Sequence, residues 1–99
     1  MEKNIVEKIC RLIEEEKIYL NAKMSEKSFS KMLGVERKAM RKIMNMGFNM
    51  DFKTFIGVNR LIYARDMMLL YGVDYHRLWV FSGFRSFREF SRLCSKVGF

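Results

Sequence analysis

The segment from Asp51 to Leu70 constrains the fold most, because its apolar residues fall on two sides of the helix that it predicts. One stripe comprises Phe52, Phe55, Ile56, Tyr63, Met67 and Leu70, and the other comprises Gly57, Leu61, Ala64 and Met68. A helix at the surface of a globular domain has one apolar stripe, whereas this one is apolar over much of its circumference. We therefore expect a long helix, capped by Asp51, that packs between two other units.

The composition favours helices on both sides of this segment. The chain of 99 residues has no proline and only six glycines, and 49% of its residues are hydrophobic. Such a chain suits helices with short connections better than a many-turned sheet, and its length allows one domain or two very small ones. We predict an all-α fold with one subdomain over residues 1–50, a linker helix over residues 51–70 and a second subdomain over residues 71–99.

Each expected subdomain contains a short helix, a glycine and a second helix. In the first, Ser25 is expected to cap a short helix that Gly34 ends, and a second helix follows over residues 36–46. In the second, a short helix ends at Gly83 and a longer helix begins near Ser86. Two helices that meet at a short turn with a glycine are the outline of a helix-turn-helix, and the two units weakly repeat each other.

The remaining segments carry helix signals of their own. Asn4 and Glu7 have the spacing of a capping box, and apolar residues then recur at helical spacing, so we expect a first helix that ends near Leu20. Residues 47–50 are expected to form a connector, and Asp74 is expected to cap the segment after the linker helix.

The charge of the chain indicates a polyanionic partner. Nineteen Lys and Arg residues oppose eleven Asp and Glu residues, which gives a formal net charge of +8. Acidic residues gather early in the chain, and the sequence is strongly basic from Lys17 onward. This balance suits nucleic acid first and an acidic membrane surface second, although positive charge can also serve solubility alone.

The second helix of each unit is predicted to have a basic face opposite an apolar one. The basic faces comprise Arg37, Lys38, Arg41, Lys42 and Asn45 in the first unit and Arg85, Arg88, Arg92 and Lys96 in the second. The apolar faces comprise Ala39, Met40, Ile43 and Met44 in the first and Phe87, Phe90, Leu93, Cys94 and Val97 in the second. A solvated face normally mixes signs, whereas Glu89 is the only acid within these helices after their start. We therefore expect both basic faces to contact DNA.

The length of the linker helix suits this interpretation. A helix of about 20 residues is about 30 Å long, which is close to one turn of B-DNA. Such a rod could hold two recognition helices in adjacent segments of the major groove.

Two stretches carry a family resemblance. "SFSKMLGVERKAMRKIMNMGFNMDFKTFIGVNRLIYARDMM" followed by "LWVFSGFRSFREFSRLCSK" resembles the DNA-binding domain of AraC/XylS-type bacterial transcription regulators over about residues 5–97. Its most specific pieces are the spacing of Phe52, Arg60 and Ala64 and the signature SGF-x-S-x-x-x-F-S-R at Ser82–Arg92.

The resemblance implies two homeodomain-like, three-helix units with a helix-turn-helix each, joined by a linker helix, and contact with RNA polymerase as an activator or repressor. It places the usual DNA-facing positions on Lys38, Arg41, Lys42, Arg88, Glu89 and Arg92. Base edges would be read by Arg41, Lys42, Arg88 and Arg92. The full set of expected DNA-contacting residues is Arg37, Lys38, Arg41, Lys42, Asn45, Arg85, Ser86, Arg88, Glu89, Arg92 and Lys96.

The sequence departs from the family pattern at several positions. Glu36 stands where the family has a Ser or Thr cap, and we expect its carboxylate to cap instead. Trp79 and Ser30 occupy usual alanine positions, and Cys94 replaces a phenylalanine, so Trp79 is expected to fill the volume lost there. The family continues with a proline-containing helix, so we expect the sequence, which stops at Phe99, to belong to a longer protein with a sensor or dimerisation domain elsewhere.

The sequence favours no enzyme, cofactor or metal. Cys10 and Cys94 match no metal-ligand spacing, His76 has no suitably spaced partner, and no phosphate-binding loop or nucleophile–base signature occurs. No signal peptide or membrane span is visible, which favours the cytoplasm. Arg60 is either structural or close to a DNA phosphate. The alternative function is a helical protein-interaction module that uses its acidic first helix or its methionines, with charge serving only solubility.

Overall fold

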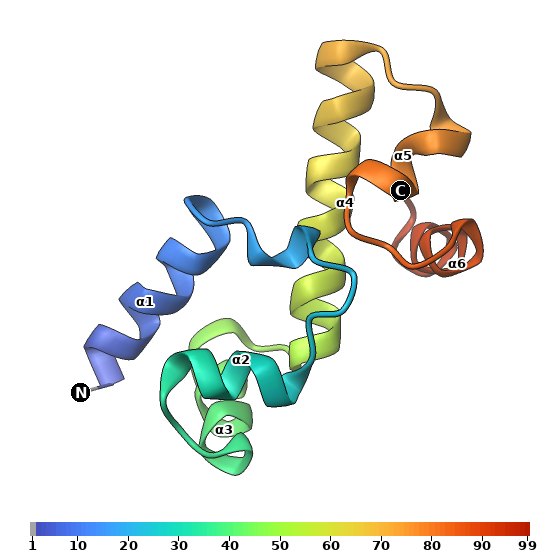
Figure 1. Ribbon diagram of the computed structural model, residues 1–99. Helices are drawn as coiled ribbons and strands as arrows, with labels where there is room; N and C mark the ends of the chain where they lie inside the picture. Colours follow the sequence, from blue (N-terminus) through green and yellow to red (C-terminus); the bar gives the residue numbers. More distant parts are fainter. Residues whose placement is uncertain (1) are drawn as a thin grey trace. The chain divides into compact units, whose positions relative to one another are not determined.

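The computed structural model describes the backbone of residues 2–99 and the surroundings of side chains from residue 5 onward (Figure 1). Within this range the regular structure is six α-helices and two short 3-10 helices, with no strand, which confirms the prediction of an all-α chain. Two compact units are formed. The first contains the chain up to Ile18 together with Met24–Ile56, and the second contains Tyr19–Lys23 and Gly57–Phe99.

The first helix, α1 (Glu2–Glu14), differs from its predicted bounds at both ends. It begins before Asn4, so Asn4 lies within the helix rather than at its cap. It also ends six residues before Leu20. The backbone of Lys17 adopts a φ of 47°, and a 3-10 helix, η1 (Ile18–Leu20), follows it. Three successive glutamates at residues 14–16 lie at the negative end of the helix dipole, which disfavours further helix.

Local capping defines α2 (Glu26–Leu33), as predicted. The Ser25 hydroxyl accepts a hydrogen bond of 3.2 Å from the backbone N–H of Ser28. Gly34 ends the helix with a φ of 72°, in the left-handed region that glycine adopts at no steric cost. Ser30 lies buried in this helix, and its hydroxyl donates to the Glu26 carbonyl oxygen at 2.7 Å.

The helix α3 (Arg37–Phe48) is longer than predicted. Gly47 remains helical, and the helix ends where Asn49 adopts a φ of 55° and its N–H donates to the Asn45 carbonyl oxygen at 3.1 Å. Asparagine is among the few residues other than glycine that tolerate this conformation. The expected connector over residues 47–50 is therefore too long. The expected cap by Glu36 is also wrong, because its carboxylate accepts no capping hydrogen bond from the described backbone.

The core of the first unit collects residues from four helices. The buried members are Ile9, Leu12, Phe29, Leu33, Met40, Met44, Phe52, Phe55 and Ile56. The Phe29 and Phe52 rings lie 5.2 Å apart between centroids, and those of Phe48 and Phe55 lie 4.8 Å apart. Burial of side chains of this size stabilises a fold by roughly 1.5–3 kcal/mol each. Met40 and Met44 therefore direct one face of α3 inward, although Ala39, expected on the same face, is exposed.

The long helix α4 (Phe52–Tyr71) matches its predicted bounds closely, and the Asp51 carboxylate accepts from the Thr54 N–H at 2.8 Å as its cap. Its apolar residues belong first to the core of one unit and then, further along the helix, to the core of the other. Phe52, Phe55 and Ile56 are buried in the first unit, and Leu61 and Ala64 in the second. Its last turn is exposed, because Leu69, Leu70 and Tyr71 are 69%, 72% and 73% exposed, although Leu70 was expected in an apolar stripe.

The second unit contains the 3-10 helix η2 (Tyr75–Arg77), α5 (Leu78–Phe81) and α6 (Phe87–Val97) beside its part of α4 (Figure 1). Asp74 caps η2 through the His76 N–H at 3.1 Å, as predicted. Leu61, Ala64, Leu78, Phe84, Phe90 and Cys94 form its buried core, and Trp79 packs against this core from a partly buried position. Gly57 lets α6 approach α4 closely, since a Cβ there would lie 2.7 Å from Leu93 Cδ2. Val97, expected on the packed face of α6, is 49% exposed.

A buried arginine of α4 binds the segment Tyr19–Lys23, which belongs to the same unit. The Arg60 side chain donates from Nε to the Tyr19 carbonyl oxygen at 2.6 Å and from Nη2 to the Asn21 carbonyl oxygen at 3.0 Å. Its guanidinium carbon also lies 5.7 Å from the centroid of the Phe84 ring, within range of a cation–π contact. Burial lowers the pKa of Arg60 from its ordinary value. These contacts decide the question left open by the sequence in favour of a structural role.

Gly83 has two reasons to be glycine, and we predict that Gly83→Ala destabilises the fold strongly. Its φ is 87°, and a Cβ would collide with the Tyr19 carbonyl oxygen and with Leu20 Cα. The backbone conformation alone accounts for about 1–3 kcal/mol, and the collision with backbone atoms adds to this. Urea denaturation followed by circular dichroism measures the loss.

Gly72→Ala is the matched control for this substitution. Gly72 has a φ of 64°, but a Cβ there would meet none of the described residues within 4 Å. We expect Gly72→Ala to lower the free energy of unfolding only by the cost of the backbone conformation. Gly83→Ala should therefore be clearly the more destabilising of the two. Equal losses would contradict the close packing of Gly83 against the segment Tyr19–Lys23.

Candidate nucleic-acid interface

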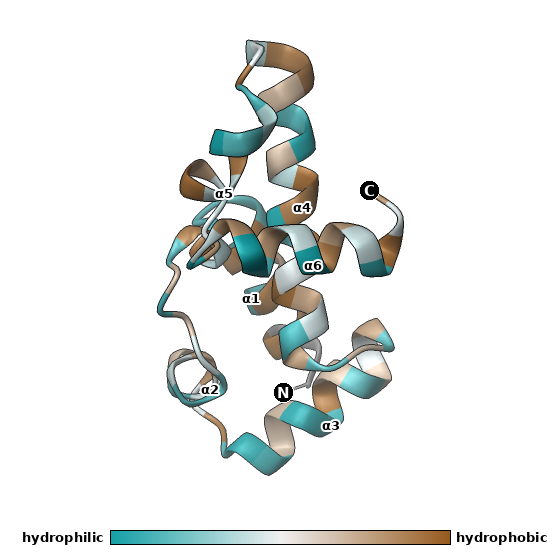
Figure 2. Ribbon diagram, turned by 90° about the vertical axis from the view of Figure 1, so that its right-hand side faces the viewer, coloured by the Kyte–Doolittle hydropathy of each residue, from teal (hydrophilic) through white to brown (hydrophobic). Residues whose placement is uncertain are grey.

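The predicted basic face of α3 is exposed along its length. Arg37, Lys38, Arg41, Lys42 and Asn45 are all exposed, while Met40 and Met44 on the opposite side are buried. Hydrophilic and hydrophobic segments alternate along this helix in Figure 2, as expected for a helix with two distinct faces. The helix thus presents four cations and an amide to the surroundings of the first unit.

Two of these cations are already paired with Glu26 of α2. Arg41 donates from Nε to Oε2 at 3.0 Å and from Nη2 to Oε1 at 2.8 Å, and Arg37 donates from Nη2 to Oε1 at 3.3 Å. These hydrogen bonds, with that of Arg41 as the largest cause, lower the pKa of the Glu26 carboxyl below its ordinary value. The same pairing raises the pKa of Arg41. Glu26 was not among the predicted site residues, and its only signal in the sequence is that it is an isolated acid in a basic stretch.

Two hydrogen bonds between side chains and backbone define the start of α6, in an arrangement close to a capping box in which the glutamate accepts from the residue before the cap. The Ser86 hydroxyl accepts from the Glu89 N–H at 3.1 Å, and the Glu89 carboxylate accepts from the Arg85 N–H at 2.8 Å. The Arg85 side chain donates from Nε to the Ala22 carbonyl oxygen at 3.1 Å. Three of the expected DNA-contacting residues, Arg85, Ser86 and Glu89, therefore hold the beginning of the helix in place.

The remaining cations of α6 project from the side opposite its core. Arg88, Arg92 and Lys96 are exposed, whereas Phe90 and Cys94 are buried. Apolar and hydrophilic residues alternate along α6 in Figure 2, as expected for a helix with two distinct faces.

Five cations on the two helices have no side-chain partner among the residues that the structure describes. Among the residues whose side chains the structure describes, no ion pair or side-chain hydrogen bond involves Lys38, Lys42, Arg88, Arg92 or Lys96. Exposed, unpaired Lys and Arg side chains on helix faces are the groups that neutralise phosphates in protein–DNA contacts. These five residues form what we call the free cation set.

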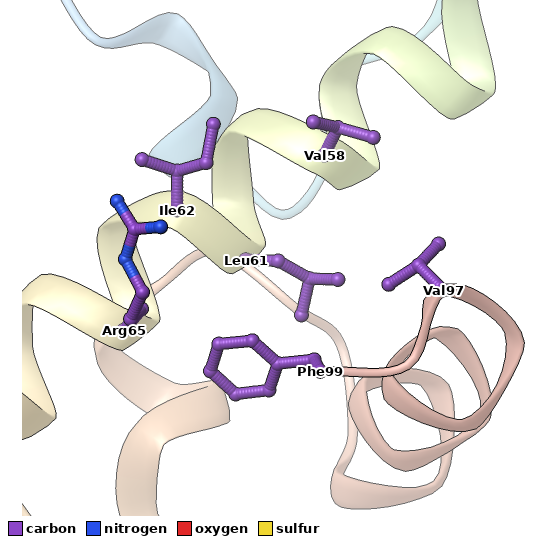
Figure 3. A pocket seen from close by; sticks show the side chains of 6 residues that line it. All are labelled: Val58, Leu61, Ile62, Arg65, Val97 and Phe99. Carbon is purple, nitrogen blue, oxygen red and sulfur yellow. The ribbon is translucent and has the colours of Figure 1, made fainter.

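Other candidate chemistry is scarce in the part of the chain that the structure describes. No group of three or more His, Cys, Asp or Glu side chains there could hold a metal ion. His76 is exposed, stacks on Phe87 at 5.4 Å between ring centroids and lies 3.7 Å from the Asp74 carboxylate. A hollow in the second unit is apolar apart from Arg65 and is lined by Val58, Leu61, Ile62, Arg65, Val97 and Phe99 (Figure 3). These residues include no nucleophile or general base.

Known proteins provide no assignment for this site. Comparisons of the chain with family models, with curated proteins and with solved structures found no match. None of the described helices combines the length and the apolar character needed to cross a membrane.

The pairing of Glu26 predicts a specific dependence of stability on pH. A carboxyl whose pKa is lowered by folding stabilises the fold above its unfolded pKa, about 4.3 for glutamate. That contribution is lost as the pH falls through the lower pKa of the folded state. We therefore expect the difference in free energy of unfolding between the native chain and Glu26→Gln to shrink as the pH drops below about 4.

Urea denaturation at a series of pH values checks this expectation. Glu36→Gln serves as the control, because it removes a carboxylate that has no ion pair among the described residues. Parallel curves of stability against pH for the native chain and Glu26→Gln would show that the Glu26–Arg41 pair does not form in solution.

Proposed function

We propose that the chain is a sequence-specific double-stranded DNA-binding domain of a bacterial transcription regulator. In this proposal α2–α3 and α5–α6 act as two helix-turn-helix units, joined by the linker helix α4, with α3 and α6 as recognition helices in adjacent major-groove segments. The observation that supports it most is the free cation set, which lies on the outward faces of two helices whose opposite faces hold the cores of their units.

The resemblance to AraC/XylS regulators supports the same proposal. Phe52, Arg60 and Ala64, which carry its linker-helix spacing, are all buried, so each contributes to the framework rather than to an exposed contact. Phe90, the second phenylalanine of the signature at Ser82–Arg92, is fully buried as well. The proposal assigns no reaction, cofactor or metal to the chain. RNA polymerase contact and a separate sensor or dimerisation domain belong to the proposal through this resemblance. A cytoplasmic location belongs to the proposal because DNA of a bacterial cell lies in the cytoplasm.

The geometry of the side chains suggests separate roles for the cations. Lysine carries a compact charge and binds phosphate without directional preference, whereas arginine can donate two parallel hydrogen bonds to guanine O6 and N7. We assign Lys38, Lys42 and Lys96 mainly to phosphate and Arg88 and Arg92 to base edges. This revises the expected base contact by Lys42.

Arg92→Ala is predicted to reduce both affinity and selectivity at one base. Loss of a bidentate contact to guanine costs about 1–3 kcal/mol and relaxes specificity at that position only. Lys96→Ala should instead weaken binding to all sequences alike, because a phosphate contact carries no sequence information. Fluorescence anisotropy with duplexes that differ at single base pairs measures both effects.

Arg77→Ala is the matched control, since it removes an exposed arginine of the second unit that lies outside α6. We expect little change in base preference from it. If Arg92→Ala leaves affinity and base preference at the level of this control, α6 is not a recognition helix.

A second function, a helical protein-interaction module, is favoured by one observation. Leu69, Leu70 and Tyr71 at the end of α4, and Val80 and Phe81 of α5, are large apolar residues that remain well exposed in the second unit. Exposed apolar side chains in one region are typical of protein contacts. Binding through them would not require the free cation set.

The salt dependence of binding separates the two functions. Neutralisation of about three phosphates by Lys38, Lys42 and Lys96 predicts that DNA affinity falls by roughly 40-fold between about 50 and 200 mM salt. The expected slope follows from counterion release and can be measured by anisotropy with a random-sequence duplex. Duplex binding that is absent at low salt, or a slope near zero, would favour the interaction module.

A further inference from the structure

The pairing of Glu26 with Arg41 leaves one edge of the arginine available. Arg41 has five N–H donors, and its Nε and Nη2 atoms each donate one hydrogen bond to the Glu26 carboxylate. The two N–H groups of Nη1 and the second N–H of Nη2 are not used by Glu26. Two parallel donors on this remaining edge match the O6 and N7 acceptors of guanine in the major groove.

The pairing also restricts where that edge can point. Glu26 lies in the first turn of α2, directly after its cap Ser25, and its side chain is 24% exposed compared with 57% for Arg41. Two hydrogen bonds at 2.8 and 3.0 Å hold the long arginine side chain at two of its nitrogen atoms. Arg37 donates to the same carboxylate at 3.3 Å and limits the freedom of Glu26 in turn.

We infer that Glu26 is a positioning residue that holds Arg41 ready to read a guanine, so that a carboxylate on α2 determines base specificity through α3. This inference rests on the proposed DNA-binding function. A side chain that is ordered before binding loses less conformational freedom in the complex, so Arg41 gains selectivity at its base. Lys38 and Lys42 on the same helix have no such support and contribute charge alone.

Glu26 should have opposite effects on specific and on non-specific binding. Its negative charge reduces the attraction of the first unit to phosphate, which weakens binding to any sequence. Its hydrogen bonds orient Arg41, which strengthens binding to the preferred sequence. Removal of the carboxylate is therefore expected to raise non-specific affinity while it lowers discrimination. A loss of folded structure would instead lower both quantities.

The experiment uses selection from random duplex DNA by the full chain, followed by affinities for the selected duplex and its single-base variants. Arg41→Ala first identifies the guanine that Arg41 reads. In Glu26→Gln we expect discrimination at that guanine to fall about tenfold, within the range of a bidentate contact. Discrimination at the other positions should stay constant, and affinity for a random duplex should rise.

Two further variants separate geometry from charge. Glu36→Gln makes the same change in net charge on an exposed residue just before α3 that has no ion pair within the described residues, so it should raise random-duplex affinity without loss of discrimination. Glu26→Asp keeps the charge but shortens the arm by one methylene, so it should lose discrimination without a gain in random-duplex affinity. Circular dichroism confirms that each variant is folded.

Several results would overturn the inference, and they differ from failure of the proposed function. If the native chain selects a sequence but Glu26→Gln keeps full discrimination at every base, Glu26 does not position Arg41. If Arg41→Ala leaves the selected sequence unchanged, Arg41 reads no base, and its pairing with Glu26 keeps it away from DNA. If the native chain selects no sequence at all, the DNA-binding proposal itself is wrong, and the inference is wrong with it.

Discussion

A buried guanidinium is the contact on which the second unit depends. Arg60 donates to two backbone carbonyl oxygens of the segment Tyr19–Lys23, which lies about 40 residues earlier in the chain. Backbone carbonyl groups that are removed from water need hydrogen-bond partners, and a charged group without partners in the interior is costly. Arg60 meets both needs at once, and the missing side chain of Gly83 gives the segment room to approach.

This contact also bears on the candidate interface. Arg85 reaches the same segment through the Ala22 carbonyl oxygen, and the N–H of Arg85 is held by the Glu89 carboxylate. The position of Arg85, just before α6, is therefore fixed by hydrogen bonds from its side chain and from its backbone N–H. Because α6 begins in one defined place, Arg88, Arg92 and Lys96 project together from the face opposite Phe90 and Cys94. The residues that the sequence suggested as DNA contacts thus divide into those that fix α6 and those that are free to bind.

The features that could be predicted from the sequence are those determined by neighbours in the chain. The caps at Ser25 and Asp51 and the glycine turn at Gly34 depend on side chains and backbone groups within a few residues, and all are confirmed. The exposed and buried faces of α3 and α6 followed from helical periodicity, apart from Ala39 and Val97 near the helix ends. The predicted end of α1 and the predicted cap by Glu36 were wrong, because the residue types at these positions allow more than one local structure.

The contacts that could not be predicted join residues far apart in sequence. Glu26 and Arg41 are 15 residues apart, and Arg60 and Tyr19 are 41 residues apart. No periodicity or local motif indicates which of many basic residues an isolated carboxylate will meet, since that depends on how α2 and α3 pack. The proposed specificity of the first unit depends on such a contact.

The most direct measurement of the central claim is a hydroxyl-radical footprint of the chain on a duplex selected from random DNA. We expect two short protected blocks about one helical turn, or about 10 base pairs, apart, one for each recognition helix. Substitution of Arg92 should weaken one block and substitution of Arg41 the other. A single block, or protection that does not depend on sequence, would contradict the assignment of α3 and α6 as paired recognition helices.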